Sequence, residues 1–290
     1  MLRQRIVTAV ILLIVLVAAM AAPSAWPFMA LLALAAGCAG WEWLRLTLPQ
    51  PPSRPLAAGG GIAIGAICLG LMAAWTIDPG PGTVAGVHAT QGFMTHGIVP
   101  LAALLWVVCA VPAVLRGRAD APPASTGLTL FAFPALLATW AVLALLFMQQ
   151  GAWFVVSLLI LVWVADIAAY FGGRAFGRRK LAPRVSPGKT IEGALCGVAA
   201  GVIWIAVSSF WEGTYGYALA RHWGLAVALP LAALLAAFSI VGDLFESLLK
   251  RRAGRKDSSA LLPGHGGVFD RIDAVLPVAP IAFLLSGLWA

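Results

Sequence analysis

Long uninterrupted runs of apolar residues constrain this chain more than any other feature of its sequence. They lie at approximately 6–22, 26–44, 56–77, 98–115, 127–148, 152–171, 190–210, 223–248 and 273–290. Most are close to the roughly 20 residues that an α-helix needs to cross a bilayer. We therefore predict an all-α, polytopic integral membrane protein with about nine transmembrane helices.

The composition excludes a water-soluble globule. Of the 290 residues, 61% are hydrophobic and only 10% are charged, whereas soluble domains carry about a quarter charged residues. No repeat or soluble domain boundary is visible, so we predict one integral membrane domain over 1–290. Eight of the eleven acids fall within 160–273. This asymmetry predicts a mainly structural role for helices in 1–125 and catalytic helices and cytoplasmic loops in 150–290.

The basic residues predict the orientation of the chain. With a cytoplasmic N-terminus and alternating spans, 18 of the 19 Lys and Arg residues face the cytoplasm and only Arg221 lies outside. The positive-inside rule favours this arrangement, so we expect a multi-pass inner-membrane protein with a cytoplasmic active site. The first run also fits a secretory signal, whose removal would leave the later topology unchanged.

The net charge of +8 could indicate a nucleic-acid partner. However, the basic residues separate membrane spans instead of forming one surface patch. Anionic lipid and phosphate are therefore the expected partners, and nucleic acid is not. Glycines spaced by four at Gly193, Gly197 and Gly201 predict close helix packing, and tryptophans such as Trp43 near run ends indicate an interfacial aromatic belt.

Three acids lie near the predicted cytoplasmic ends of spans, where an ionisable group usually faces a cavity or a partner. Asp166 shares a helical face with Tyr170 at i+4, which could line a cavity or anchor a loop arginine. Asp243 and Glu246 are spaced i, i+3 and project from one face. The pair fits a metal site as well as it fits a buried ion pair.

Two loops between spans are rich in charge. Residues 172–190 combine six basic residues with glycine and proline, which fits a phosphate cradle but also a solvated positive loop. It is not a Walker motif, because Pro183 replaces the required first glycine. Residues 247–273 hold acids as well as bases. This mixture suits a divalent cation that bridges carboxylates and phosphate oxygens.

This second loop resembles the signature of phosphatidate cytidylyltransferases. The matching positions are Ser247, Leu249, Lys250, Arg251, Lys256, Asp257, Ser259, Leu262, Pro263, His265, Gly266, Gly267, Val268, Asp270, Arg271, Ile272 and Asp273. The resemblance continues upstream at Asp166, Ala169, Tyr170, Gly173, Arg174, Gly177, Lys180, Pro183, Ser186, Pro187, Lys189, Thr190, Glu192, Gly193, Gly242, Asp243 and Glu246. Family members often carry a second lysine where this chain has Gly188.

The resemblance implies a nucleotidyltransferase that moves CMP from CTP to phosphatidic acid, giving CDP-diacylglycerol and pyrophosphate for phospholipid synthesis. It also implies Mg²⁺. The expected catalytic residues are Asp243, Asp270, Lys250, Arg251 and Lys256. The expected substrate-binding residues are Tyr170, Arg174, Ser186, Lys189, Thr190, His265, Gly266, Gly267 and Arg271. The expected metal ligands are Asp243 and Asp270, supported by Asp166, Glu246 and Asp273.

Two alternatives stay open at this point. A secondary transporter would also place acids inside a helical bundle, although near the middle of the membrane. A cytidylyltransferase for another lipid phosphate would differ only in its apolar helix faces. The sequence leaves the oligomeric state undecided, with a homodimer as one option. Membrane lipids are expected partners.

Overall fold

The structure, a computed structural model, describes residues 2–49, 53–76 and 84–288 and is almost entirely helical. The first half contains α1 (Leu2–Ala21), α2 (Trp26–Thr47), α3 (Ser53–Thr76), α4 (Val84–Phe93), η1 (Met94–Ile98), α5 (Val99–Leu105), η2 (Trp106–Ala110), α6 (Val111–Arg116) and α7 (Thr126–Gln150). The second half contains α8 (Ala152–Phe176), β1 (Lys180–Ala182), β2 (Ser186–Thr190), α9 (Ile191–Ser208), α10 (Tyr215–Trp223), α11 (Leu225–Arg252), α12 (Phe269–Ile272) and α13 (Val275–Leu285). The predicted all-α class is confirmed.

Seven helices in the described ranges are long and apolar enough to cross a membrane, which confirms a polytopic membrane protein. The first and ninth predicted runs are also helical but shorter. The apolar part of α1 covers Ile6–Ala21, and α13 has 11 residues. Every residue of α13 from Val275 to Phe283 is buried. Its apolar composition therefore reflects a place in the protein core.

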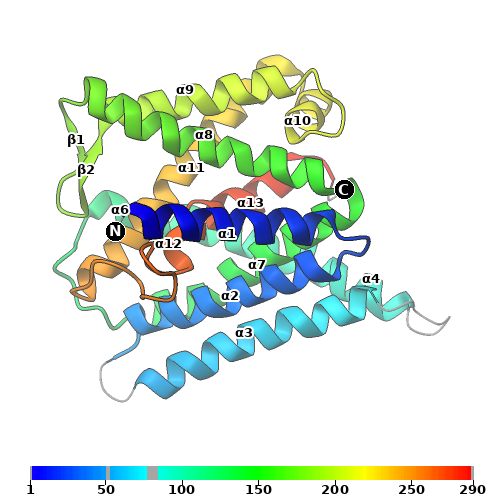
Figure 1. The fold of residues 1–290 in the computed structure, drawn as a ribbon, viewed down its shortest axis with the longest axis horizontal. Helices are drawn as coiled ribbons and strands as arrows, with labels where there is room; N and C mark the ends of the chain where they lie inside the picture. Colours follow the sequence, from blue (N-terminus) through cyan, green and yellow to red (C-terminus); the bar gives the residue numbers. More distant parts are fainter. Residues whose placement is uncertain (1, 50–52, 77–83, 289–290) are drawn as a thin grey trace.

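The helices run back and forth so that the predicted cytoplasmic segments gather at one end of the bundle. Figure 1 shows the end of α2, the end of α6, the β1–β2 hairpin and the end of α11 on the left. α10, which carries Arg221, lies at the opposite end. The fold thus brings the basic loops together as the sequence predicts.

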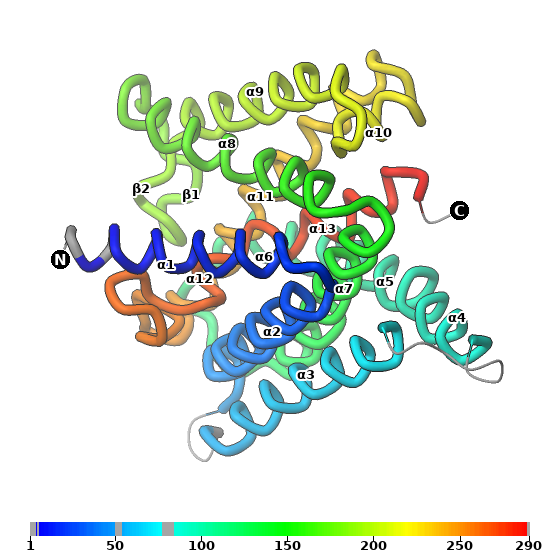
Figure 2. The backbone as a smooth tube through the Cα atoms, turned by 45° about the vertical axis from the view of Figure 1, so that its right-hand side comes forward, coloured from blue at the N-terminus to red at the C-terminus, as the bar shows by residue number. Residues whose placement is uncertain are grey.

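The fourth span is longer than its apolar run. The sequence predicts 98–115, whereas the helical span covers Val84–Arg116; its first part, α4 and α5, lies at the right of Figure 2. Two π-helical turns, η1 and η2, interrupt it, and each directly precedes a segment with proline in its first turn, Pro100 or Pro112. Because proline has no N–H to donate to the preceding turn, a wider turn there keeps the helix continuous.

Glycines let α8 and α9 pack closely. A Cβ on Gly193 would lie 2.6 Å from the Ala169 carbonyl oxygen, and one on Gly197 would lie 2.7 Å from that of Ala165. Gly201, one turn later, instead faces α11. The predicted close packing is confirmed, and it serves two neighbouring helices.

A cluster of buried rings joins α2 to the C-terminal helices. Trp43 is fully buried and stacks on Phe269 with ring centroids 5.0 Å apart, and Trp106, Phe131 and Phe245 surround it. The prediction that Trp43 belongs to an interfacial belt is therefore wrong. Its ring supports α12, which begins the last part of the signature segment.

Candidate active site

The basic segment between α8 and α9 forms the short antiparallel hairpin of β1 and β2. Glu192, at the start of α9, accepts hydrogen bonds from the backbone N–H groups of Arg178 and Arg179, at 3.0 and 3.2 Å. The Thr190 hydroxyl accepts the N–H of Gly193 and caps the same helix. The hairpin is thus fixed to α9, which sets the position of its charged side chains.

A cavity of about 500 Å³, here called the hairpin cavity, lies between the hairpin, α8, α9 and α11. Lys189 reaches from β2 to Asp243 on α11, with Nζ 2.5 Å from Oδ2. The Ser247 hydroxyl donates to the other oxygen of Asp243 at 3.4 Å. The predicted site residues that line this cavity are Asp166, Tyr170, Arg174, Ser186, Lys189, Thr190 and Asp243.

Acids outnumber bases around Lys189. Asp166 interacts electrostatically with both Lys189 and Asp243, and Asp273 does the same. Carboxylate oxygens of this kind suit a hard cation such as Mg²⁺. The ion pair between Lys189 and Asp243 places one positive charge beside this carboxylate. Within the described residues, however, no three His, Cys, Asp or Glu side chains are grouped closely enough to form a ready metal site.

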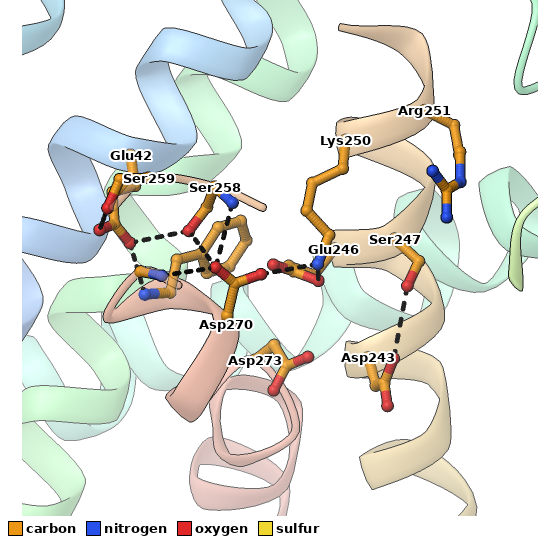
Figure 3. Close-up of polar contacts among 12 residues, drawn as sticks. Glu42, Asp243, Glu246, Ser247, Lys250, Arg251, Ser258, Ser259, Asp270 and Asp273 are labelled. Carbon is orange, nitrogen blue, oxygen red and sulfur yellow. Dashed lines mark hydrogen bonds and ion pairs between the residues drawn. The ribbon is translucent and has the colours of Figure 1, made fainter. Parts of the chain in front are cut away.

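A second polar cluster centres on Lys250. Its ammonium lies 2.6 Å from Glu246 and 2.6 Å from Asp270 (Figure 3). The three side chains are 14%, 2% and 5% exposed, respectively. The predicted helix ends at 248, but α11 continues to Arg252. This extra turn places Lys250 at i+4 from Glu246, so the two pair along one helical face.

Asp270 is held by donors from three directions. Besides Lys250, the backbone N–H and hydroxyl of Ser258 donate to it at 3.0 and 2.7 Å, and the N–H of Gly267 donates at 2.7 Å. Burial alone would raise the pKa of Asp270, but hydrogen bonds from Lys250, Ser258 and Gly267 outweigh it and hold the pKa below its ordinary value. Asp270 is therefore a fixed carboxylate that orients Lys250.

A second cavity of about 620 Å³, here called the loop cavity, lies between the start of α1 and the loop before α12. It is lined by the predicted residues Lys256, His265, Gly266 and Arg271. The buried Nδ1 of His265 has no hydrogen-bond partner in the described parts of the chain.

Arg251 points away from both Lys250 and Asp270 (Figure 3). Its Nε donates to the backbone carbonyl of Val185, in the hairpin, at 3.3 Å. The side chain therefore ties the hairpin to α11 and lines neither cavity.

A model of the cytidylyltransferase family matches residues 3–289. This chain belongs to the cytidylyltransferase family. A phosphatidate cytidylyltransferase of Pseudomonas aeruginosa is 38% identical over 296 residues, which cover 100% of this chain and 98% of the relative. One of Brucella suis is 47% identical over 137 residues, or 47% of each chain. One of Thermotoga maritima is 43% identical over 138 residues, 44% of this chain and 48% of the relative.

In this cytidylyltransferase most of the predicted site residues occupy three neighbouring places, and Arg251, Gly267 and Asp273 belong to none of them. One group lines the hairpin cavity, another lines the loop cavity, and Glu246, Lys250 and Asp270 form the buried cluster. Asp243 and Asp270, predicted to share an ion, are not in contact. Asp243 binds Lys189, and Asp270 binds Lys250 on the other side of Glu246 (Figure 3). That Asp243 and Asp270 bind one metal ion stays a prediction, and their positions do not support it.

One residue of this cytidylyltransferase that sequence analysis missed is Glu42 in α2. It is completely buried and accepts hydrogen bonds from Ser258, Ser259 and the backbone just before and at the start of α12. A signal was present, because Glu42 is the one acid in an apolar run of about 20 residues. Such a residue is costly in a membrane span without partners.

Proposed function

We propose that this protein transfers CMP from CTP to phosphatidate and releases pyrophosphate. The full-length relative carries that activity in its name, and the family model spans the chain. The observation that carries the proposal is the hairpin cavity, where Lys189, Arg174 and Asp243 from three separate elements line one space. Cationic side chains beside carboxylates suit polyphosphate chemistry.

The chemistry requires no nucleophilic side chain. A phosphatidate phosphate oxygen, ionised near neutral pH, bonds to the α-phosphorus of CTP. The bond from that phosphorus to the bridging oxygen of the β-phosphate breaks, and pyrophosphate leaves with the electron pair. The protein must then position two anions and neutralise their charge.

The basic residues have distinct parts in this proposal. Lys189 and Arg174 bind phosphate oxygens in the hairpin cavity, and Lys256, His265 and Arg271 bind substrate from the loop cavity. Lys250 lines neither cavity, and its ammonium is held by two carboxylates. Because it is held from both sides, its charge is pre-oriented and needs little reorganisation during the reaction.

We propose Mg²⁺ as the metal, held chiefly by Asp243 with Asp166 and Asp273 nearby. Hard oxygen ligands suit it, and when bound it would offset negative charge on the phosphates. Lys189 would then release Asp243 and turn to substrate. The electrostatic grouping of these acids around Lys189 supports the assignment.

The orientation in the membrane is also a proposal. The basic loops share one end of the bundle with both cavities, and the positive-inside rule puts that end in the cytoplasm of an inner-membrane protein. CTP would enter from the aqueous side. The lipid would enter sideways from the inner leaflet, because moving acyl chains through water would forfeit about 0.8 kcal/mol for each buried CH₂.

The transporter hypothesis is weaker, because the acids gather at one end of the bundle, whereas transporter sites lie near the membrane midplane.

A direct assay tests the proposed enzymatic activity. Purified protein in detergent should release pyrophosphate only when labelled CTP, Mg²⁺ and phosphatidate are all present. Release with a polyprenyl phosphate instead of phosphatidate would support the other-lipid alternative, and no release with either lipid would refute the proposal. Cross-linking of the same preparation tests the homodimer.

A further inference from the structure

Glu42 is unusual for a buried acid, because no ion pair joins it to a basic group among the described side chains. It lies in α2 and is 0% exposed. A buried carboxylate without compensation is costly. Arg45, on the same helix, interacts with it electrostatically, but neutral donors must supply the direct contacts that stabilise its charge.

Three neutral donors do so, a fourth is shared with Asp270, and all four come from the signature segment. Oε1 accepts the Ser259 hydroxyl at 2.5 Å and the N–H of Val268 at 3.1 Å. Oε2 accepts the N–H of Phe269 at 2.6 Å and lies 3.1 Å from the Ser258 hydroxyl. One side chain thus holds both ends of the loop between Ser258 and Phe269.

Two further contacts fix the same loop to α2. Trp43, next to Glu42, stacks on Phe269. A Cβ on Gly267 would lie 2.5 Å from Oε2 of Glu42 and would also collide with the Ser258 hydroxyl. Only glycine lets the loop approach the carboxylate this closely.

The network continues from Glu42 to the buried cluster. The Ser258 hydroxyl lies within hydrogen-bond distance of both Glu42 and Asp270, at 3.1 and 2.7 Å. Its single proton can serve one carboxylate at a time, and the shorter distance favours Asp270. Asp270 in turn holds Lys250 at 2.6 Å. The position of Lys250 thus depends on a loop that Glu42 anchors.

We propose that Glu42 is a positioning residue for CMP transfer: it fixes the 258–269 loop so that Asp270 holds Lys250 in place. This inference rests on the proposed function. It gives the N-terminal half a part in shaping the active site, because α2 supplies the anchor. Glu42 itself lines neither cavity, so it acts through the loop.

The test compares Glu42→Gln with wild type in two measurements. Glutamine keeps the shape of the glutamate side chain. Its NH₂ group, however, is a hydrogen-bond donor and would face the N–H and hydroxyl donors that the carboxylate now accepts. We expect kcat/KM for CTP to fall about 100-fold, the loss that a misplaced catalytic group can cause. We also expect a higher KM for CTP and faster hydrogen exchange in residues 258–269. Glu42→Asp keeps the negative charge, so it should recover part of the CTP kinetics and part of the slow hydrogen exchange.

Glu212→Gln is the matched control, because Glu212 is an exposed acid in the α9–α10 connection, at the other end of the bundle. It should behave as wild type. Unchanged KM and loop exchange in Glu42→Gln would overturn the proposal, even if less protein folds. If Glu42→Gln does not fold, Ser259→Ala is tested instead, because it removes one donor to Glu42. This variant should speed hydrogen exchange at Val268, and unchanged exchange there would overturn the proposal. Absence of CMP transfer by wild type would refute the proposed function, while the exchange measurements would still test the anchor.

Discussion

Replacing Asp270 with asparagine should destabilise the loop and impair turnover. Asp270 is 5% exposed and accepts one charged and three neutral hydrogen bonds. Breaking a buried ion pair costs roughly 3–5 kcal/mol. Because Lys250 keeps Glu246 as a partner and the asparagine oxygen keeps some donors, we expect a loss of about 2–4 kcal/mol in the free energy of unfolding.

The loss should depend on pH in a defined direction. The pKa of Asp270 is lowered in the folded protein, so the ionised group stabilises the fold above the ordinary aspartate pKa near 4. As pH falls from there toward the lowered folded-state pKa, that stabilisation disappears. The difference between wild type and Asp270→Asn should be constant above about pH 5 and should shrink in more acidic solution.

Titration of the folded protein with a denaturing detergent, at several pH values, measures the difference. Asp120→Asn is the control, because it makes the same chemical change at an exposed site and should cost less than about 1 kcal/mol. CMP transfer should fall at least tenfold in Asp270→Asn, since Lys250 loses one of its two supports. Equal unfolding free energies for wild type and Asp270→Asn would refute the reasoning.

Three other results are expected. Gly267→Ala should lower both thermal stability and turnover, because its Cβ would collide with Ser258 and Glu42; wild-type behaviour would show that the loop has room to shift. Asp243→Asn and Lys189→Met should each remove most CMP transfer, and the double variant should be little worse, because the two side chains act as one pair; additive losses would contradict this. In a cysteine-free background, an impermeant thiol reagent should label Arg221→Cys from outside and Arg184→Cys only after the membrane is opened, and labelling of the latter from outside would overturn the orientation.

The sequence alone determined the membrane class, the approximate helices and the segments that hold the site. Hydropathy and helical periodicity depend on residues that are neighbours in the chain, so they can be read locally. The same local reasoning placed Asp166 and Tyr170 on one face and the basic loops at one end. It also located the signature segment that the family match supports.

Tertiary structure decided which charged groups meet. Glu42 and Phe269 are 227 positions apart, and nothing near either residue in the sequence specifies the other. Asp243 and Asp270 looked equivalent as acids near a basic loop, but packing of α11 against the hairpin and α12 gave each a different lysine. The extra turn of α11 was decisive for Lys250, because it converted a loop residue into a partner of Glu246. Hydrogen bonds and ion pairs act over a few ångströms, so their partners are fixed by how distant segments pack and not by local sequence.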